Sequence, residues 1–442
     1  MAYIPQRRRW LLVLLTCCII SVLYVSHDLY FSRGYWAKSP ELISLDPLDT
    51  HVPSQSNHTN TNTNSTNTTT ISTPHSQRTL IVSAMFPLEK SKHPSSDYVI
   101  WLHNFFLITT PIYIFLPTSL ASLLPSSLPP HMTVNSTYDS VFDLPIMHGM
   151  KVAYQENWEL DREKGRHGPE LYAIWNSKAW LLDEGAKNAN GGQWDSIFWV
   201  DAGSFRTEHS YRAWPAAERI EEIWRRWKGL GEERVFFPIF DTPKSKNREW
   251  REEDGPVDED ISIASFFGGS PSAIRWYASA FYAYHAHYLS LPTPLFIGKD
   301  QSIINSLFLL FPTRFISVFH NDPHSSARIP PSSILSHRYW RDVWKSTFSA
   351  FSPSRALGKC SDEWYYYQYF FAGEEERKEM GDRWLGDTDG WDRWPLGKGG
   401  ERREEDRCRL TGTVAMEEVL RREDVFGADW RAPEHSLDLG SK

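Results

Sequence analysis

The sequence has few cysteines, no full-length apolar run and no excess of positive charge. Its 442 residues include four cysteines, none in a C-x-x-C pair, so a zinc ribbon and a small scaffold held by many disulfides are both excluded. The apolar run at residues 10–25 has 16 residues, fewer than the about 20 of a full transmembrane span. The formal net charge of −8 argues against a nucleic-acid partner.

The cysteines fall into two groups. Cys17 and Cys18 lie inside the apolar run, where they face lipid or carry palmitate. Cys360 and Cys408 are the remaining two, and they can form one disulfide in an oxidising compartment. Whether their side chains meet is a question of geometry that the fold decides.

The N-terminus has the pattern of a membrane signal anchor. Three arginines at 7–9 precede the apolar run, and the residues that end it, LYVSH at 23–27, make a poor A-x-A-like cleavage site. A run of this length can cross a thin early-secretory bilayer. We therefore predict an uncleaved anchor at 10–26, with residues 1–9 in the cytosol and the remainder in the lumen. A cleaved signal peptide is the alternative.

Composition divides the rest of the chain into three parts. Residues 27–77 form a predicted disordered lumenal stem, because 54–77 consist mainly of Ser, Thr and Asn and cannot bury enough apolar surface to offset their ordering entropy. This stretch also holds three N-x-S/T glycosylation acceptors. Residues 78–345 are long enough for one large domain with its own core, and 346–442 form an aromatic and charged C-terminal extension.

Strand and helix patterns alternate along the predicted domain. Strands are expected at 79–86, 112–116, 196–200, 235–240 (interrupted at Pro238), 261–267 and 315–319, and helices at 97–107, 170–187, 216–227, 271–289 and 299–311. Such alternation predicts an α/β fold with a mainly parallel sheet and helices on both faces. The charged stretch at 248–260 is expected to be a surface loop.

The segment SIFWVDAGSFR at 196–206 is the most informative in the chain. Four apolar residues lead into Asp201 and a glycine, which is how a buried strand ends at the carboxyl edge of an open α/β sheet. Ligands bind at that edge, so Asp201 is a candidate for the nucleotide or metal end of an active site. The alternative is an aspartate that only caps the turn after the strand.

Four short motifs follow one another in a fixed order: WNSK at 175–178, WVDAG at 199–203, FFGG at 266–269 and KDQS at 299–302. In this order and spacing the chain resembles the HtrL/YibB family of proposed glycosyltransferases, and more distantly the GT-A glycosyltransferases. The resemblance covers about residues 79–320. It implies a GT-A-like, Rossmann-type sheet that binds a nucleotide-sugar donor at its carboxyl edge.

The resemblance also implies a D-x-D motif after the central strand, in which the acids bind the nucleotide and a divalent cation, Mn or Mg. Here the third position is Gly203, so Asp201 stands alone. Three readings remain open. Asp201 holds a metal together with His320; or Asp201 contacts only the nucleotide, with Lys178 and Arg206 supplying positive charge; or the site is inactive. A histidine that caps a loop is the alternative for His320.

The other motifs suggest further site residues. In KDQS, the family pattern makes Asp300 the catalytic acid near the acceptor, followed by Gln301, although a carboxylate at a helix start is also stabilised by the helix dipole. Gly268 and Gly269 would allow close approach to a sugar, or simply make a tight turn. In WNSK, Asn176 is a candidate substrate-binding residue, and Lys178 is a candidate for binding the diphosphate.

These observations together predict a single-pass type II membrane glycosyltransferase of the secretory pathway, in the Golgi or a related membrane. It would transfer a sugar from a nucleotide-sugar donor to a lumenal glycan, glycoprotein or glycolipid, and would contact the membrane through residues 10–26. The alternative is a non-catalytic sugar-binding or scaffold protein on the same fold that assists another transferase. The donor, the acceptor and the stereochemical course are not specified by the sequence.

Overall fold

The computed structural model describes residues 78–91, 93–190, 192–227, 233–320, 322–327, 357, 360, 364–386, 407–437 and 439. These residues belong to one compact unit, Ser72–Lys442. The predicted anchor at 10–26 and stem at 27–77 lie outside them. Among the described helices, none is both long enough and apolar enough to cross a membrane.

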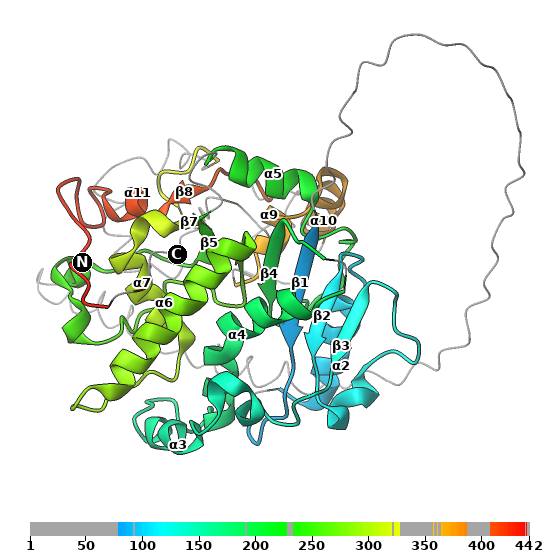
Figure 1. The fold of residues 1–442 in the computed structure, drawn as a ribbon. Coiled ribbons are helices and arrows are strands. Elements are labelled where there is room, and N and C mark those ends of the chain that lie inside the picture. Colours follow the sequence, from blue (N-terminus) through cyan, green and yellow to red (C-terminus); the bar gives the residue numbers. More distant parts are fainter. Residues whose placement is uncertain are drawn as a thin grey trace, which may run out of the picture. The chain divides into compact units, whose positions relative to one another are not determined.

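The described elements alternate between strands and helices as expected (Figure 1). The strands are β1 (Thr79–Ala84), β2 (Ile112–Phe115), β3 (Met132–Asn135), β4 (Ser196–Val200), β5 (Val235–Ile239), β6 (Phe266–Gly269), β7 (Phe315–Phe319) and β8 (Val414–Ala415). The helices are α2 (Ser95–Phe105), α3 (Lys151–Glu159), α4 (Pro169–Asn188), α5 (Ala217–Arg225), α6 (Pro271–Ser290), α7 (Asp300–Leu310), α9 (Tyr367–Phe370), α10 (Glu374–Gly386) and α11 (Met416–Leu420).

One sheet of eight strands runs in the order β3-β2-β1-β4-β6-β5-β7-β8. The pairs β3/β2, β2/β1, β1/β4 and β5/β7 are parallel, whereas β6 runs antiparallel to β4 and β5, and β8 runs antiparallel to β7. The predicted mainly parallel α/β sheet is confirmed. The short strands β3 and β8 were not predicted, because neither has a long apolar run.

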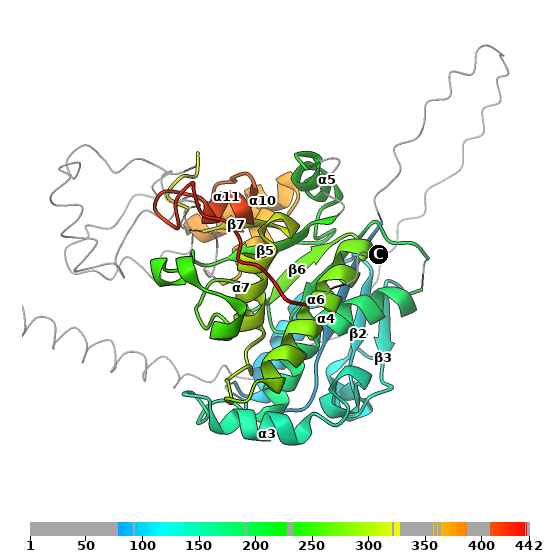
Figure 2. The ribbon, with the colours of Figure 1, turned by 60° about the vertical axis from the view of Figure 1, so that its left-hand side comes forward.

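Both faces of the sheet are buried, and alternate strand residues enter two separate cores. Leu80 and Val82 of β1 pack into one core, while Ile81 packs into the other. The first core is covered by α4, α6, α7 and α11, and the second by α2, α5, α9 and α10. Helices α4 and α6 lie side by side in front of the sheet (Figure 1; Figure 2).

The long helices begin at local signals that the sequence carries. Helix α6 starts after Ser270, whose hydroxyl accepts the backbone N–H of Ala273 at 3.2 Å, with Pro271 in the first turn. Helix α4 likewise begins with a proline, Pro169, after Gly168. Both helices therefore start within a residue of the predicted positions.

Strand β5 runs through Pro238, although an interruption was predicted there. The Pro238 carbonyl accepts the N–H of Ile263 at 2.9 Å, on the side away from β7. A residue in a strand directs its N–H and C=O to the same side, so the missing N–H of Pro238 faces Ile263 and not the β5/β7 ladder. The ladder therefore continues past the proline. The strand predicted at 261–267 is found a few residues later in the chain, as β6.

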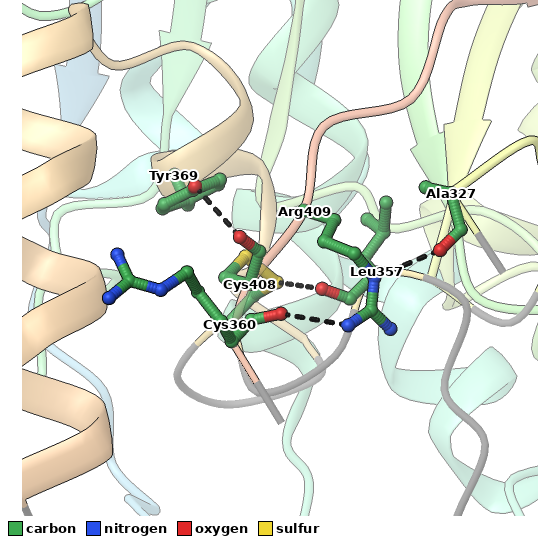
Figure 3. Close-up of a disulfide and its surroundings, with 7 residues drawn as sticks. Ala327, Leu357, Cys360, Tyr369, Cys408 and Arg409 are labelled. Carbon is green, nitrogen blue, oxygen red and sulfur yellow. Dashed lines mark hydrogen bonds between the residues drawn. A yellow bond between two sulfur atoms is a disulfide. The ribbon is translucent and has the colours of Figure 1, made fainter. Parts of the chain in front are cut away.

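The C-terminal extension is part of the same unit as the sheet. Strand β8 pairs with β7, and α9 packs into the second core through residues such as Phe370. The predicted disulfide is confirmed: Cys360 and Cys408 are bonded, with their Cα atoms 4.9 Å apart (Figure 3). Beside it, the hydroxyl of Tyr369 donates to the Cys408 carbonyl at 2.9 Å. The bond thus joins two C-terminal segments next to α9.

Candidate functional site

Asp201 lies at the carboxyl edge of the sheet, directly after β4. Strand β4 is parallel to β1, and the strand order reverses between them, with β2 and β3 on one side of β1 and the remaining strands beyond β4. In open α/β sheets, ligands bind in the crevice that such a reversal leaves at the carboxyl ends of the strands. The predicted position of Asp201 is therefore confirmed at the level of the fold.

Lys178 of α4 forms ion pairs with both Asp201 and Asp300. Its Nζ lies 3.1 Å from Asp201 Oδ1 and 3.3 Å from Asp300 Oδ2, and it donates to the Ala264 carbonyl at 3.1 Å. Burial alone would lower the pKa of Lys178, but the two carboxylates outweigh it and the pKa is raised. Residues from three separate motifs, WNSK, WVDAG and KDQS, thus meet around one buried ammonium.

Asp300 is the less accessible of the two carboxylates. Its side chain is 7% exposed, whereas that of Asp201 is 33% exposed. Burial raises the pKa of Asp300 to about 6; the Lys178 ammonium opposes this rise, and the charge of Asp201 adds to it. Oδ1 accepts the Gln301 N–H at 2.9 Å, but Oδ2 is buried without an aligned hydrogen-bond donor. Its charged neighbour is the Lys178 ammonium, 3.3 Å away.

The Asp201 carboxylate is oriented by its own strand. The indole Nε1 of Trp199, two residues earlier and so on the same face of β4, donates to Asp201 Oδ1 at 2.7 Å. The Asp201 N–H donates to the Ser265 carbonyl at 2.9 Å. Side chain and backbone are both fixed, and Oδ2 accepts a hydrogen bond from Lys178 Nζ at 3.3 Å. The sequence motif WVDAG contains Trp199, but its role was not predicted.

The loop after Asp201 is held by its own turn and by two other segments. Ser204 N–H donates to the Asp201 carbonyl at 2.9 Å, which closes a turn. Asn104 of α2 donates to the Phe205 carbonyl at 3.0 Å, and Gln368 of α9 donates to the Ser204 carbonyl at 2.8 Å. This loop is therefore set from both ends of the described chain.

Arg206, predicted to supply positive charge, lies between two aromatic rings. Its guanidinium is 4.4 Å from the Trp101 ring centre and 5.1 Å from that of Tyr365, and its Nε donates to the Gly203 carbonyl at 3.2 Å. The guanidinium is exposed and forms no ion pair with any described carboxylate. Arg206 is thus a fixed cation at the rim of the site.

The third position of the expected D-x-D motif has no room for an acid. A Cβ atom on Gly203 would lie 3.2 Å from Cε3 of Trp101. A carboxylate there would have to displace a buried tryptophan that also stacks on Arg206. The absence of a side chain at position 203 therefore fits the close packing of Trp101 against this loop.

The predicted metal pair, Asp201 and His320, is not a pair in the structure. His320 follows β7, three strands from β4 and so about 14 Å away across the sheet. Its buried ring packs 5.4 Å from Tyr366. Within the described parts of the chain, no group of three or more His, Cys, Asp or Glu side chains is arranged to hold a metal ion. The donor set therefore does not fit the divalent cation that the resemblance implies.

Asn176 and Gln301 act on the backbone rather than on a surface open to substrate. Asn176 is fully buried, and its Nδ2 donates to the carbonyls of Ile297 and Gly298 at 3.2 and 3.1 Å. Gln301 Nε2 donates to the Ser262 carbonyl. These contacts position the start of α7, and with it Asp300. The substrate-binding prediction for Asn176 is replaced by this positioning role.

Gly268 and Gly269 have a packing role instead of the predicted contact with a sugar. They pair with Phe198 and Ile197 in the interior of the sheet, away from the β4 end that carries Asp201. A Cβ atom on Gly268 would lie 2.2 Å from Phe198 Cδ1, and one on Gly269 would lie 2.9 Å from the Arg234 carbonyl. The glycines are needed because β4, β5 and β6 approach closely here.

The C-terminal segment supplies site contacts that sequence reasoning missed. The hydroxyl of Ser265, the residue whose carbonyl accepts the Asp201 N–H, donates to the Tyr367 hydroxyl at 3.2 Å. The hydroxyl of Tyr366 donates to the Ile239 carbonyl at 2.9 Å and to the Val318 carbonyl. The run of aromatics at 364–371 was a visible signal, but nothing in its pattern indicated which residues it would contact.

Comparisons with known proteins do not extend this picture. No protein-family model matches the chain, and no curated protein sequence matches it significantly. The arrangement around Lys178 is therefore the basis for a functional proposal, together with the motif order described above.

Proposed function

We propose that this protein is a glycosyltransferase that transfers a sugar from a nucleotide-sugar donor to a lumenal glycan, glycoprotein or glycolipid. The observation that carries the proposal is the Lys178 ammonium between Asp201 and Asp300, at the reversal point of the sheet. A parallel sheet with a carboxylate at this point suits a nucleotide ligand. A GT-A-like fold is the finer form of this proposal, and the four motifs in their order support it.

Each of the central residues has a role in the proposed reaction. In an inverting transfer, Asp300 accepts the proton of the acceptor hydroxyl as its oxygen bonds to the anomeric carbon. The bond from that carbon to the diphosphate oxygen breaks, and the nucleoside diphosphate leaves with the electron pair. In a retaining transfer, Asp300 would stabilise the reacting sugar instead. Asp201 binds the nucleotide end of the donor.

Cationic side chains stabilise the negative charge that gathers on the leaving diphosphate. In this proposal Lys178, which is buried, and Arg206, which is exposed, supply the positive charge. The described residues do not fit a divalent cation held by Asp201 and His320, so no step is assigned to a metal.

The proposed setting is the lumen of the secretory pathway, with a type II anchor at residues 10–26. The disulfide between Cys360 and Cys408 supports an oxidising compartment, because cytosolic proteins rarely keep such bonds. The sequons at Asn57, Asn64 and Asn67 are consistent with the same compartment.

The decisive test compares the full-length protein with its Asp201→Ala variant. Thermal shift and nucleoside diphosphate release are measured against a panel of nucleotide-sugars, with and without Mn²⁺. We expect one donor to stabilise the wild type and to be turned over, and both effects to be lost in the variant while its far-ultraviolet circular dichroism is unchanged.

Two outcomes would reject the transferase. Stabilisation by a donor with no turnover on any acceptor or on water would favour the sugar-binding or scaffold protein, which the buried position of Asp300 also allows. Absence of binding by every donor, in a folded protein, would remove the nucleotide site altogether.

A further inference from the structure

Lys178, Asp201 and Asp300 together provide no spare positive charge for a ligand that carries phosphate. One ammonium faces two carboxylates at 3.1 and 3.3 Å, so this cluster carries no surplus of positive charge. A ligand with two or more phosphate charges needs cations whose charge is not already neutralised. Two cations near this edge of the sheet meet that condition: Arg206, described above, and Lys90.

Lys90 belongs to the loop that follows β1, and it borders a cavity. The cavity has a volume of about 810 Å³ and is lined by Glu89, Lys90, Ser91, Gly165 and Arg166. The first three follow the carboxyl end of β1, and the last two precede α4. Since β1 and β4 are parallel neighbours, this cavity opens at the same edge of the sheet as Asp201. All five lining residues are exposed, so the cavity is an open depression at the surface.

The cavity has two cations that are only weakly compensated. Lys90 Nζ lies 4.6 Å above the Trp158 ring, and no carboxylate among the described residues forms an ion pair with it. Arg166 is 3.9 Å from Glu163, a carboxylate that Lys299 already contacts at 3.1 Å. Glu89 is the one acid that lines the cavity.

Two other cations of the same loop differ from this pair. Arg162 is bonded to Asp258, and Lys164 lies 3.1 Å from Glu159. Neither lines the cavity. Arg166, 3.9 Å from a carboxylate that Lys299 also contacts, is therefore less fully compensated than Arg162 and Lys164.

The loop that carries Arg166 is held in place by buried contacts. The buried Asp161 carboxylate accepts the Tyr172 hydroxyl at 2.6 Å and the Glu163 N–H at 2.8 Å, and it pairs with His167 Nδ1 at 2.8 Å. Trp158, whose ring faces Lys90, also donates through Nε1 to the His167 carbonyl at 3.0 Å. One tryptophan therefore contacts Lys90 from one side of the cavity and the His167 carbonyl from the other.

We propose that this cavity binds a phosphate group, with Lys90 and Arg166 as its charge partners. Arginine offers paired N–H donors to phosphate oxygens, and lysine adds a compact point charge. The phosphate comes either from the diphosphate of the donor or from a phosphate carried by the acceptor. The inference rests on the proposed function for the identity of that ligand, and on the cavity alone for the site.

The test uses calorimetric titration of inorganic pyrophosphate into the full-length protein at low salt. The variant Lys90→Ala/Arg166→Ala removes the cavity cations. The matched control, Arg162→Ala/Lys164→Ala, removes the same charge from the same region. We expect the Kd to rise about tenfold or more in the first variant and less than about twofold in the control. Equal Kd values in both variants, or no binding to the wild type, would overturn the proposal.

Further arms identify the source of the phosphate and separate the two proposals. The donor supplies the phosphate if the cavity variant weakens the binding of a nucleoside diphosphate as much as that of pyrophosphate. The binding of the plain nucleoside should then be unaffected. The acceptor supplies the phosphate if the variant weakens the binding of pyrophosphate and of a sugar phosphate but not that of the nucleoside diphosphate. Cavity-dependent pyrophosphate binding without turnover of any donor would keep the site and reject the transferase. Normal turnover with unchanged Kd values would reject the site alone.

Discussion

The ammonium of Lys178 lies 3.1 Å from the carboxylate of Asp201, although the two residues belong to different elements and only one of them is largely buried. The pair sits where the strand order reverses, and the lysine side chain is withdrawn from water while the aspartate remains one-third exposed. A ligand that reaches Asp201 therefore contacts a carboxylate that is already ion-paired with the buried Lys178 ammonium. Asp300 is the second carboxylate that forms an ion pair with Lys178.

Replacing Lys178 by methionine should destabilise the protein, because it leaves the Asp300 carboxyl buried without its counter-ion. Removing one partner of a buried ion pair typically costs about 3–5 kcal/mol, and the partial exposure of Asp201 places Lys178→Met near the lower end, about 3 kcal/mol. Urea denaturation at pH 7.5 measures the free energy of unfolding.

The double variant Lys178→Met/Asp300→Asn serves as the control. It removes the buried charge along with its partner, so it should recover a large part of the lost stability. If the double variant is as unstable as Lys178→Met, the loss comes from packing around the lysine stem and the electrostatic account is wrong.

The raised pKa of Asp300 gives a pH dependence of stability that one variant should remove. The folded-state pKa is about 6 and the ordinary value is 3.8, so the native protein holds this proton more tightly than the unfolded chain. Its stabilising contribution is complete below pH 3.8 and is lost as the pH rises through 6. We expect Asp300→Asn to lack that decline in the free energy of unfolding between pH 4.5 and 7.

The same titration should shape the rate. A general base must be ionised, so donor turnover should rise with pH through about 6 and then level off. Asp300→Asn should lower kcat by about 10²–10⁴-fold with little change in the affinity for the donor. If a partly active Asp300 variant shows the same fall in turnover at acidic pH as the wild type, a group other than Asp300 causes that fall.

An acid at position 203 should not create a metal site. Gly203→Asp brings its Cβ to 3.2 Å from Trp101, so we expect a loss of about 1–3 kcal/mol in stability and no new dependence on Mn²⁺. Gly203→Ala has the same Cβ without the charge and separates crowding from electrostatics. A gain of Mn²⁺-dependent turnover in Gly203→Asp would show that Trp101 yields easily and that the site readily accepts a cation.

Sequence periodicity predicted the sheet and its major helices because long apolar runs dominate those elements. It also placed Asp201 directly after a buried strand, whereas Lys178 and Asp300 were found through the motifs WNSK, inside α4, and KDQS, at the start of α7. Elements without such runs were missed, among them β3, β8 and α3. Patterns of this kind report burial, and these segments are short or largely polar.

The contacts across the site could not be predicted in the same way. Tyr365, Gln368 and Trp101 reach the Asp201 loop only because distant segments pack together, and no local pattern encodes that. The predicted pairing of His320 with Asp201 failed for a related reason. Both residues follow parallel strands, but the sequence does not say how many strands separate them.

The packing role of Gly268 predicts a sharp difference between two glycines. Gly268→Ala would place a methyl group 2.2 Å from Phe198 and 2.5 Å from the Ile197 carbonyl, and backbone cannot move aside cheaply. We expect it to lose about 3 kcal/mol or more, or to fail to fold. A Cβ on Gly165 meets nothing within 4 Å, so Gly165→Ala should change stability by less than about 0.5 kcal/mol. Thermal denaturation of both tests this.

The disulfide should matter to the site through the segment that follows it. Cys360 precedes by a few residues the stretch whose Tyr365 stacks on Arg206 and whose Gln368 donates to the Ser204 carbonyl. We expect Cys360→Ser/Cys408→Ser to lose about 2–4 kcal/mol of stability. Hydrogen exchange should become faster at the Ala216 amide, which donates to Phe371, while the amides of β1 in the sheet centre remain protected.

Gln368→Ala separates the local contact from the covalent link. It removes the hydrogen bond to Ser204 and leaves the disulfide intact, so it should loosen the Asp201 loop with a smaller loss of global stability, about 1 kcal/mol. Donor affinity should then fall in both variants, because each frees the loop that holds Asp201 and Arg206. If affinity falls in neither, the C-terminal segment stabilises the fold without setting the geometry of the site, and the aromatic rim around Arg206 has no part in binding.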